Sequence, residues 1–245
     1  MLSGSGFGGA SRWVARLPPF LQRALQVDQM EFDSALSQMY SLLVKPNVVS
    51  KMSKARKMTK NHYYRDDPAF VVLQLFFIVV TVVAYHLSLG NGFLALLYYI
   101  VYDITVYVIT AFIGASVTLV VLTKYMMRDT FVNEARRDIE WQYCFDVHCN
   151  GYFVYFMWTR VVQYLLLHAL LSTSMYACVI SVLLFLGGCV SYFYTVFLGY
   201  LELPVLTSQQ KLMYPVPVLA FVALVILFCN YNLTAAIVCY HWPAA

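Results

Sequence analysis

Long apolar blocks alternate with short polar stretches along most of this chain. Five blocks of about 20 residues or more carry almost no charge, at about 70–89, 93–123, 151–171, 174–198 and 214–239. A helix needs ~20 apolar residues to cross the ~30 Å hydrocarbon core of a bilayer. The pattern therefore predicts five transmembrane helices. As one helix the second block would extend roughly 46 Å, so we expect it to tilt or to project from the membrane.

A different, amphipathic pattern precedes the first block. Asp28 and Glu31 have the spacing of a capping box, and Pro46 follows the last periodic residue, which predicts a helix over about 28–44. We expect its apolar face to lie on the bilayer or against the membrane spans. The residues of this face recur at helical spacing: Phe32, Ala35, Leu36, Met39, Tyr40 and Leu43.

A cluster of cations follows this amphipathic segment. Such charges orient a membrane protein, and they also attract anionic lipid headgroups at about 1 kcal/mol each. Orientation is the simpler interpretation, and adhesion to lipid comes second. RNA is not an expected partner, because no RNA-binding module accompanies the charges. The cluster begins at Lys45, and its candidate lipid-facing patch is Lys51, Lys54, Arg56, Lys57 and Lys60.

The cations along the whole chain are sorted to one side of the predicted spans. Ten of the 16 Lys and Arg residues precede Phe70, four lie in 124–150, and Lys211 lies in 199–213. The positive-inside rule therefore predicts that the N-terminus and both of these loops are cytosolic, with 240–245 on the lumenal side. The sixteenth cation, Arg160, lies inside a predicted span.

Composition agrees with a membrane protein and excludes an ordinary soluble domain. The chain is 61% hydrophobic and only 11% charged, whereas soluble domains are near ~25% charged. Its six cysteines do not form a disulfide framework, because most lie in or beside apolar spans. Cys178 and Cys239 both approach the non-cytosolic face, so a bridge between them remains open.

Residues 1–27 have the composition of a disordered tail. The stretch is rich in Gly and Ser and lacks the apolar core of a secretory signal. Arg12, Arg16 and Arg23 precede the first acid, which also resembles a mitochondrial transit peptide. A cytosolic tail is the preferred interpretation. The predicted organisation is therefore this tail, a cytosolic region over 28–69 and a five-span domain over 70–239.

Two residues that are charged at neutral pH lie inside the predicted spans. Asp103 and Arg160 are each about ten residues from an end of their block, and a pair between them would satisfy both charges. Gln163 and His168 extend a polar stripe beyond Arg160. The sharper hypothesis is an ion or proton pathway, as in a small transporter or channel. We favour a structural pair that joins the two helices over such a pathway, because the spans contain no further acidic residues that could continue it.

The loop predicted over 124–150 is the candidate docking region for a cytosolic partner. It contains charges of both signs together with aromatic residues. A second polar run, Arg65-Asp66-Asp67-Pro68, leads into the first span, where an aspartate caps the coming helix. The predicted partner-binding residues in these two stretches are Arg65, Asp66, Asp67, Glu140, Trp141, Phe145, Asp146, His148 and Asn150.

Known catalytic motifs are absent from the sequence. It contains no P-loop, no Gly-x-Ser-x-Gly, no His-Glu-x-x-His and no calcium loop. A metal-dependent enzyme would need Asp66, Asp67, Asp138, Asp146 and His148 to converge on one point. We prefer structural roles for these residues. The sequence therefore predicts no enzyme, no cofactor and no metal site.

Several short motifs together resemble the Unc-fifty (uncoordinated-fifty) family of Golgi membrane proteins. They appear in order between about residues 28 and 215, and each one alone is weak. The motifs are Gln29-Met30-Glu31-Phe32 with Gln38-Met39, Arg65-Asp66-Asp67-Pro68-Ala69-Phe70, Glu140-Trp141, Phe145-Asp146-Val147-His148-x-Asn150, Phe197-Leu198-Gly199-Tyr200-x-x-Leu203-Pro204 and Tyr214-Pro215.

The resemblance implies a five-span, all-α protein of the Golgi membrane and early secretory pathway, with a cytosolic N-terminus and a lumenal C-terminus. It further implies a trafficking adaptor that recruits cytosolic machinery, such as Arf guanine-nucleotide exchange factors, and supports transport of membrane-protein cargo. It carries over no catalytic residues. The expected partners are therefore membrane lipid, cytosolic trafficking proteins and membrane cargo.

Overall fold

The computed structural model describes residue 22 and residues 30–90, 92–127 and 139–242. The tail predicted over 1–27 lies almost wholly outside these residues, as do Asp28, Asp138 and most of the first half of the predicted central loop. The principal helices of the described part are α3 (Phe32–Val44), α4 (Asn47–Lys60), α5 (Ala69–Leu89), α6 (Phe93–Tyr125), α8 (Trp141–Phe156), α9 (Gln163–Leu165), α10 (Leu167–Leu170), α11 (Met175–Leu201), α12 (Pro215–Phe228) and α13 (Leu233–His241).

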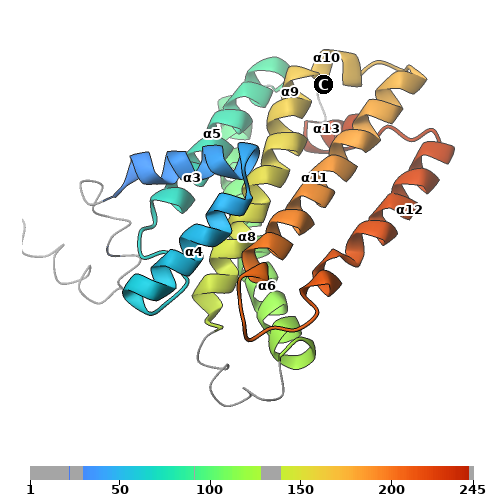
Figure 1. Cartoon of the computed structure of the whole chain (residues 1–245). Coiled ribbons are helices and arrows are strands. Elements are labelled where there is room, and N and C mark those ends of the chain that lie inside the picture. The colour runs from blue at the N-terminus through green and yellow to red at the C-terminus, as the bar shows by residue number, and fades with distance from the viewer. Residues whose placement is uncertain (1–21, 23–29, 91, 128–138, 243–245) are drawn as a thin grey trace, which may run out of the picture.

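The long helices form a bundle with α8 at its centre. Helix α8 packs against α6 on one side and α11 on the other, while α12 lies outside the bundle beside α11 (Figure 1). Helix α4 and the start of α8 lie toward one end of the bundle, here called the α4 end. Helices α10 and α13 lie at the other end, here called the α10 end (Figure 1).

Four helical stretches in the described part are long and apolar enough to cross a membrane. They are Ala69–Leu89, Phe93–Tyr125, Met175–Leu201 and Gln209–Phe228, the last of which includes the 3-10 turn η4 (Gln209–Met213). These stretches agree with four of the five predicted blocks. The fold is therefore that of an all-helical membrane protein, and the number of five spans stays a prediction.

The predicted third span is helical but is not one regular α-helix. Helix α8 passes without a gap into a π-helical turn, η3 (Met157–Val162), and then into the short helices α9 and α10. The predicted loop 124–150 is also shorter than expected, because Trp141–Asn150 forms the first turns of α8. Polar residues at this helix start resemble a loop in sequence, but Asp146, His148 and Asn150 are buried against neighbouring elements.

The block predicted as one helix over 214–239 is divided in two. Helix α12 ends at Phe228, and Asn230 adopts a left-handed conformation with φ of 50°. Asn232 then caps α13, since its side-chain oxygen accepts a hydrogen bond from the backbone N–H of Ala235 at 3.1 Å. Hydropathy did not indicate this break because both segments are apolar, so the two asparagines were its only local signal.

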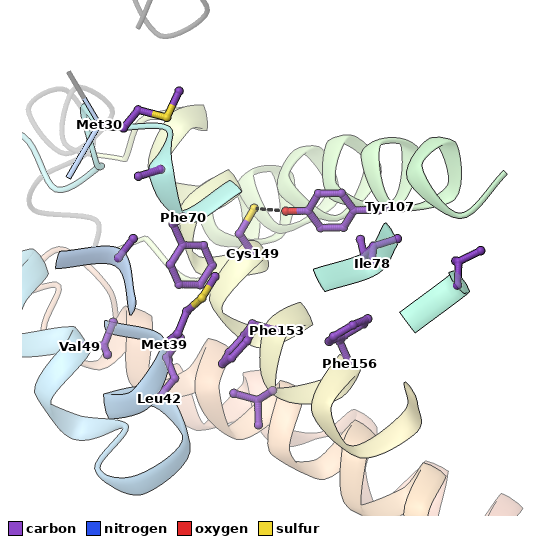
Figure 2. Packing of buried hydrophobic residues seen from close by; sticks show 14 residues of the cluster. Met30, Met39, Leu42, Val49, Phe70, Ile78, Tyr107, Cys149, Phe153 and Phe156 are labelled. Carbon is purple, nitrogen blue, oxygen red and sulfur yellow. Dashed lines mark hydrogen bonds between the residues drawn. The ribbon is translucent and has the colours of Figure 1, made fainter. Parts of the chain in front are cut away.

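Helix α3 packs against the bundle, one of the two placements expected for its apolar face. Its buried residues are Ala35, Gln38, Met39 and Leu42, so the inward face includes Gln38 and excludes Leu36, Tyr40 and Leu43. Met39 and Leu42 contribute to a cluster with Phe70 of α5 and Phe153 and Phe156 of α8, which Figure 2 shows. The rotation of the helix leaves a second apolar stripe on its outer side.

Candidate functional site

A buried charge pair fastens the N-terminal region to the bundle. Arg65 and Asp146 are only 8% and 5% exposed, and Arg65 Nε lies 3.5 Å from Asp146 Oδ1. The backbone N–H of Arg65 donates a short hydrogen bond to the same carboxylate, through Oδ2. A carboxylate removed from water in this way needs both the charge and the hydrogen bond to be stable.

Three further groups complete the surroundings of the Arg65 guanidinium. One nitrogen donates to Asn150 Oδ1 at 2.8 Å and to the Asp146 carbonyl at 3.2 Å, and another donates to Gln38 Oε1 at 3.4 Å. The guanidinium carbon also lies 4.0 Å from the centre of the Phe70 ring, within range of a cation–π interaction. The node of Arg65, Gln38, Asp146 and Asn150 therefore joins α3, the 61–68 segment and α8.

Asp66 and Asp67 differ in their roles although they are adjacent. Asp66 forms an ion pair with Lys60 at 2.6 Å, and His62 Nε2 lies 3.4 Å from its carboxylate. Asp67 accepts hydrogen bonds from two backbone N–H groups, those of Ala69 at 3.0 Å and Glu31 at 2.7 Å. Asp67 is thus the residue that caps the start of α5, and it also holds the start of α3 in place.

Replacing Asp67 with alanine is expected to lower stability by about 1 kcal/mol, because two N–H groups lose their acceptor. For a chain of this size the midpoint of thermal unfolding should fall by roughly 2–4 °C. Asp67→Asn retains a side-chain oxygen that accepts one of these bonds and should recover part of the loss. If the Asp67→Ala protein were as stable as the unchanged one, the capping role of Asp67 would be refuted.

An open cleft of ≈ 390 Å³ lies between α3, α4 and the 61–68 segment. Its wall is amphipathic, with Phe70, Ala35 and Met52 beside polar and charged groups. Residues of both charges line the cleft, whereas a site for anionic lipid would be lined by cations alone. The charged residues of the lining are Glu31, Arg56, Lys60, Arg65, Asp66 and Asp67.

The remaining predicted docking residues are distributed between surface and interior. Glu140 is exposed at the start of α8, whereas His148 is buried against α6 and α11. Trp141 donates its indole N–H to Ser116 Oγ of α6 at 3.1 Å, and its ring stacks on that of Phe145. Burial assigns Asp146, His148 and Asn150 to internal contacts, while Glu140 and Asp66 remain accessible; partner binding itself stays a prediction.

The two accessible acids, Glu140 and Asp66, both act electrostatically on Tyr64. The pKa of the Tyr64 hydroxyl is raised by burial and then by the negative charges of Glu140 and Asp66. The phenol thus stays protonated well above neutral pH and can donate a hydrogen bond to an acceptor. These three residues are together called the Glu140–Tyr64–Asp66 spot. Of the three, Asp66 lines the cleft.

Several cations of the predicted lipid-facing patch interact with the protein itself. Arg56 donates to the Tyr63 carbonyl at 3.1 Å and to Ser53 Oγ at 2.9 Å. Burial and then the charge of Arg65 lower the pKa of the Arg56 guanidinium, opposed by Asp146. Lys54 pairs with Glu202 of the segment after α11 at 3.2 Å, and its side chain is 58% exposed. Lys51 is exposed, so parts of the patch still face outward.

The intramembrane residues Asp103 and Arg160 are brought together with a third group. Arg160 Nη2 and His241 Nε2 lie 3.4 Å and 3.2 Å from the same oxygen, Asp103 Oδ1. Sequence reasoning missed His241, because the residue comes from α13, which folds back against the bundle. The cluster therefore joins α6, η3 and α13.

A second polar chain runs beside this cluster. Gln163 donates to Thr234 Oγ1 at 3.0 Å, and Tyr85 donates to Gln163 Oε1 at 3.2 Å. Ser181 and Thr234 are fully buried, and their hydroxyls lie 2.9 Å apart. His168, the other member of the predicted stripe, is exposed on α10. These bonds tie α5, α9, α11 and α13 to one another at the α10 end.

The described residues contain no group of three His, Cys, Asp or Glu side chains arranged to hold a metal ion. Asp138, one of the five residues considered for a metal-dependent enzyme, lies outside the described residues. All six cysteines fall within the described ranges and are free, including Cys178 and Cys239. Cys178 instead lies 3.6 Å from the Asn230 carbonyl.

These features define a class: a multi-span helical membrane protein that carries a folded N-terminal region on a buried ion pair. The UNC-50 family is matched over residues 20–242, which is nearly the whole chain. The chain therefore belongs to the UNC-50 family.

Three relatives illustrate this membership. Protein unc-50 homolog of Dictyostelium discoideum is 33% identical over 239 residues, which cover 95% of this chain and 90% of that protein. Protein unc-50 homolog of Drosophila melanogaster is 31% identical over 97% of this chain and 92% of its own length. Protein unc-50 of Caenorhabditis elegans is 33% identical over 82% and 66%, respectively. No solved structure matches the chain.

Proposed function

We propose that this protein is a non-enzymatic adaptor of the Golgi membrane and early secretory pathway. In this proposal it recruits cytosolic trafficking proteins, such as Arf guanine-nucleotide exchange factors, and supports the transport of membrane-protein cargo. Membership of the UNC-50 family supports the proposal, and so does the resemblance of the motifs to Golgi proteins of that family. The proposal assigns no enzymatic activity because the sequence contains none of the catalytic motifs considered above.

The proposed orientation places the α4 end in the cytosol. Its support is the distribution of cations. Of the 16 Lys and Arg residues, 15 lie before α5, at Lys124 near the end of α6, or in the loops that precede α8 and α12. The exposed Lys51 and the largely exposed Lys54 would then lie near anionic lipid of the cytosolic leaflet. The C-terminal residues after α13 would be lumenal.

One observation carries the docking proposal: the N-terminal region is held rigidly on the bundle. Helices α3 and α4 and the 61–68 segment, together called the platform, are fixed to α8 by the buried Arg65–Asp146 pair. A platform held in this way presents its cleft without a large loss of conformational entropy on binding. The cleft of ≈ 390 Å³ and the Glu140–Tyr64–Asp66 spot offer apolar surface and charges of both signs to a protein partner.

The test is recruitment of an Arf exchange factor to native membranes that contain the full-length protein. Glu140→Arg combined with Lys60→Glu inverts two exposed charges at this face without altering the buried Arg65 node. We expect recruitment to fall about ten-fold, because like charges set against a complementary partner surface cost binding energy. Proximity labelling from the N-terminus measures the change.

His168→Glu supplies the matched control, since it changes the charge of an exposed residue at the α10 end. It should leave recruitment at the original level. Unchanged recruitment by the Glu140→Arg/Lys60→Glu protein, with normal abundance and thermal stability, would refute this docking face. Equal losses in the variant and the control would refute it as well.

The alternative of a transporter or channel that uses Asp103 and Arg160 receives less support. Asp103 Oδ1 is shared by Arg160 and His241, so the charges compensate one another and join three helices. This arrangement favours a role in holding the α10 end together.

A further inference from the structure

A second sizeable cavity lies on the side of the bundle that carries the α3–α4 junction. It is a groove of ≈ 370 Å³, and its lining comes from three regions that are distant in sequence. Leu43 and Pro46 come from the α3–α4 junction, Met157 and Trp158 from the π-helical turn, and Tyr194 from α11. The groove therefore exists only because the platform is held against α8 and α11.

Most residues that line the groove are apolar, and the hydroxyl-bearing ones are Ser191, Tyr194 and Thr195. Leu43, Trp158 and Tyr194 are 44%, 40% and 41% exposed, so they offer hydrophobic surface to whatever fills the groove. The hydroxyl group of Thr195 is already used, because it donates to the Ser191 carbonyl at 2.8 Å. Water has few partners in such a site, whereas a hydrocarbon chain fits it.

The position of the groove identifies the medium at its opening. One wall is α11, which is long and apolar enough to span a membrane, and the opposite wall is the π-helical turn that continues α8. A groove along such a span lies beside lipid chains where the span crosses the membrane. The irregular turn of η3 shapes this wall, as π-helical turns often do at binding sites.

Charge and exposed apolar residues mark the end of the groove nearest the platform. Lys45 lies between the lining residues Leu43 and Pro46, and it is exposed. The outer side of α3 also exposes Leu36 and Tyr40, which suits a helix at the boundary of a bilayer. A cation at the mouth of an apolar groove matches a phospholipid, whose phosphate is anionic and whose tails are hydrocarbon.

We propose that this groove is a binding site for one membrane phospholipid. One acyl chain lies between the π-helical turn and α11, and the anionic headgroup lies beside Lys45 at the α3–α4 junction. The lipid thereby bridges the platform and the bundle. This inference rests on the protein lying in a membrane and is independent of the proposed adaptor role, because its readout involves no protein partner.

The test uses full-length protein in lipid nanodiscs that contain a phospholipid with a photoactivatable acyl chain. Crosslinked positions are mapped by mass spectrometry, and labelling is expected to concentrate on 157–162 and 191–195. Ser191→Phe fills the groove from α11 and should lower this labelling about ten-fold, the effect of losing about two buried methylene groups. Leu183→Phe, at an exposed position of the same helix outside the groove, should leave it unchanged.

A second arm tests the headgroup. Lys45→Gln should lower the preference for phosphatidylserine over phosphatidylcholine roughly five-fold, while Lys211→Gln, an exposed cation outside the groove, should not. Val162→Phe narrows the groove from its opposite wall and replaces Ser191→Phe if that protein does not fold.

Labelling spread evenly along the exposed faces of α6 and α11 would overturn the site. The same conclusion would follow if Ser191→Phe and Leu183→Phe had equal effects. Crosslinks from the groove to a second copy of the chain in place of lipid would also overturn it. Retained chain labelling with an unchanged headgroup preference in Lys45→Gln would refute the assigned position of the anionic headgroup.

Discussion

The Asp146→Ala protein is expected to lose about 3–5 kcal/mol of stability, the largest effect of any single change considered for this chain. The substitution leaves the Arg65 guanidinium buried beside Gln38 and Asn150 without a counter-charge. It also removes the acceptor of the Arg65 backbone N–H. Both groups then bear the cost of burial without compensation.

The loss can be followed through two cysteines of α8. Cys144 and Cys149 are fully buried on either side of Asp146, so a thiol-reactive dye reports when α8 separates from its neighbours. The assay requires the exposed Cys229 and Cys239, the partly buried Cys189 and the buried Cys178 to be replaced by serine, so that only the two thiols of α8 remain. The midpoint of thermal unfolding in Asp146→Ala should fall by roughly 6–20 °C.

Two further variants separate charge from hydrogen bonding. Asp146→Asn keeps an oxygen for the Arg65 N–H but loses the charge, so its loss should be intermediate. Glu202→Gln breaks the exposed pair with Lys54 and should cost no more than about 1 kcal/mol. If Asp146→Ala lowered the midpoint no more than Glu202→Gln, the Arg65–Asp146 pair would not be what fastens the platform to the bundle.

Gly114→Ala is expected to destabilise the protein by about 1–3 kcal/mol, through crowding and not through loss of a contact. A methyl group on Gly114 would stand 2.4 Å from His148 Nδ1 and 2.7 Å from Cε1. The imidazole has little room to move, because His148 is buried and its Nδ1 lies 2.8 Å from the Tyr192 hydroxyl. Helices α6 and α8 must therefore separate, and the unfolding midpoint should fall by roughly 2–12 °C.

Gly187→Ala is the matched control for the effect of the alanine itself. Its nearest atoms, in Trp158, would be 3.8 Å from the new methyl group, which is an ordinary contact. This variant should be neutral or slightly more stable, since alanine favours a helix. In a double-mutant cycle, His148→Ala should cancel much of the cost of Gly114→Ala. Additive losses would mean that the imidazole is not the source of the crowding.

The two ends of the bundle contain their polar groups for different reasons. At the α4 end, Arg65 and Asp146 hold a folded platform against α8. At the α10 end, Asp103, Arg160 and His241 fold α13 back onto the bundle. The proposed lipid groove lies between these regions, where the platform meets α11 and the π-helical turn.

Among the site residues, local sequence reasoning succeeded where the cause is local. The two aspartates before Pro68 indicated a helix cap, and Asp67 is that cap. It did not separate exposed from buried positions in the stretch 140–150, since all of its polar residues resemble a surface loop. Asp146 and Asn150 are one helical turn apart and both face Arg65, a relation across 81 and 85 residues that only packing creates.

The apolar blocks and their composition were sufficient to determine an all-helical membrane protein, because the hydrocarbon core imposes a minimum length of apolar helix that is visible in sequence. The same reasoning could not show that residues 214–239 form two helices. Hydropathy measures how readily residues enter an apolar medium, and it does not show where the backbone changes direction. The tertiary structure alone decided that α13 turns back to Asp103, that α3 rotates to bury Gln38, and that Arg65 lies beside Asp146. Each of these depends on satisfying a buried polar group with a partner far away in the chain, and no local pattern encodes that partner.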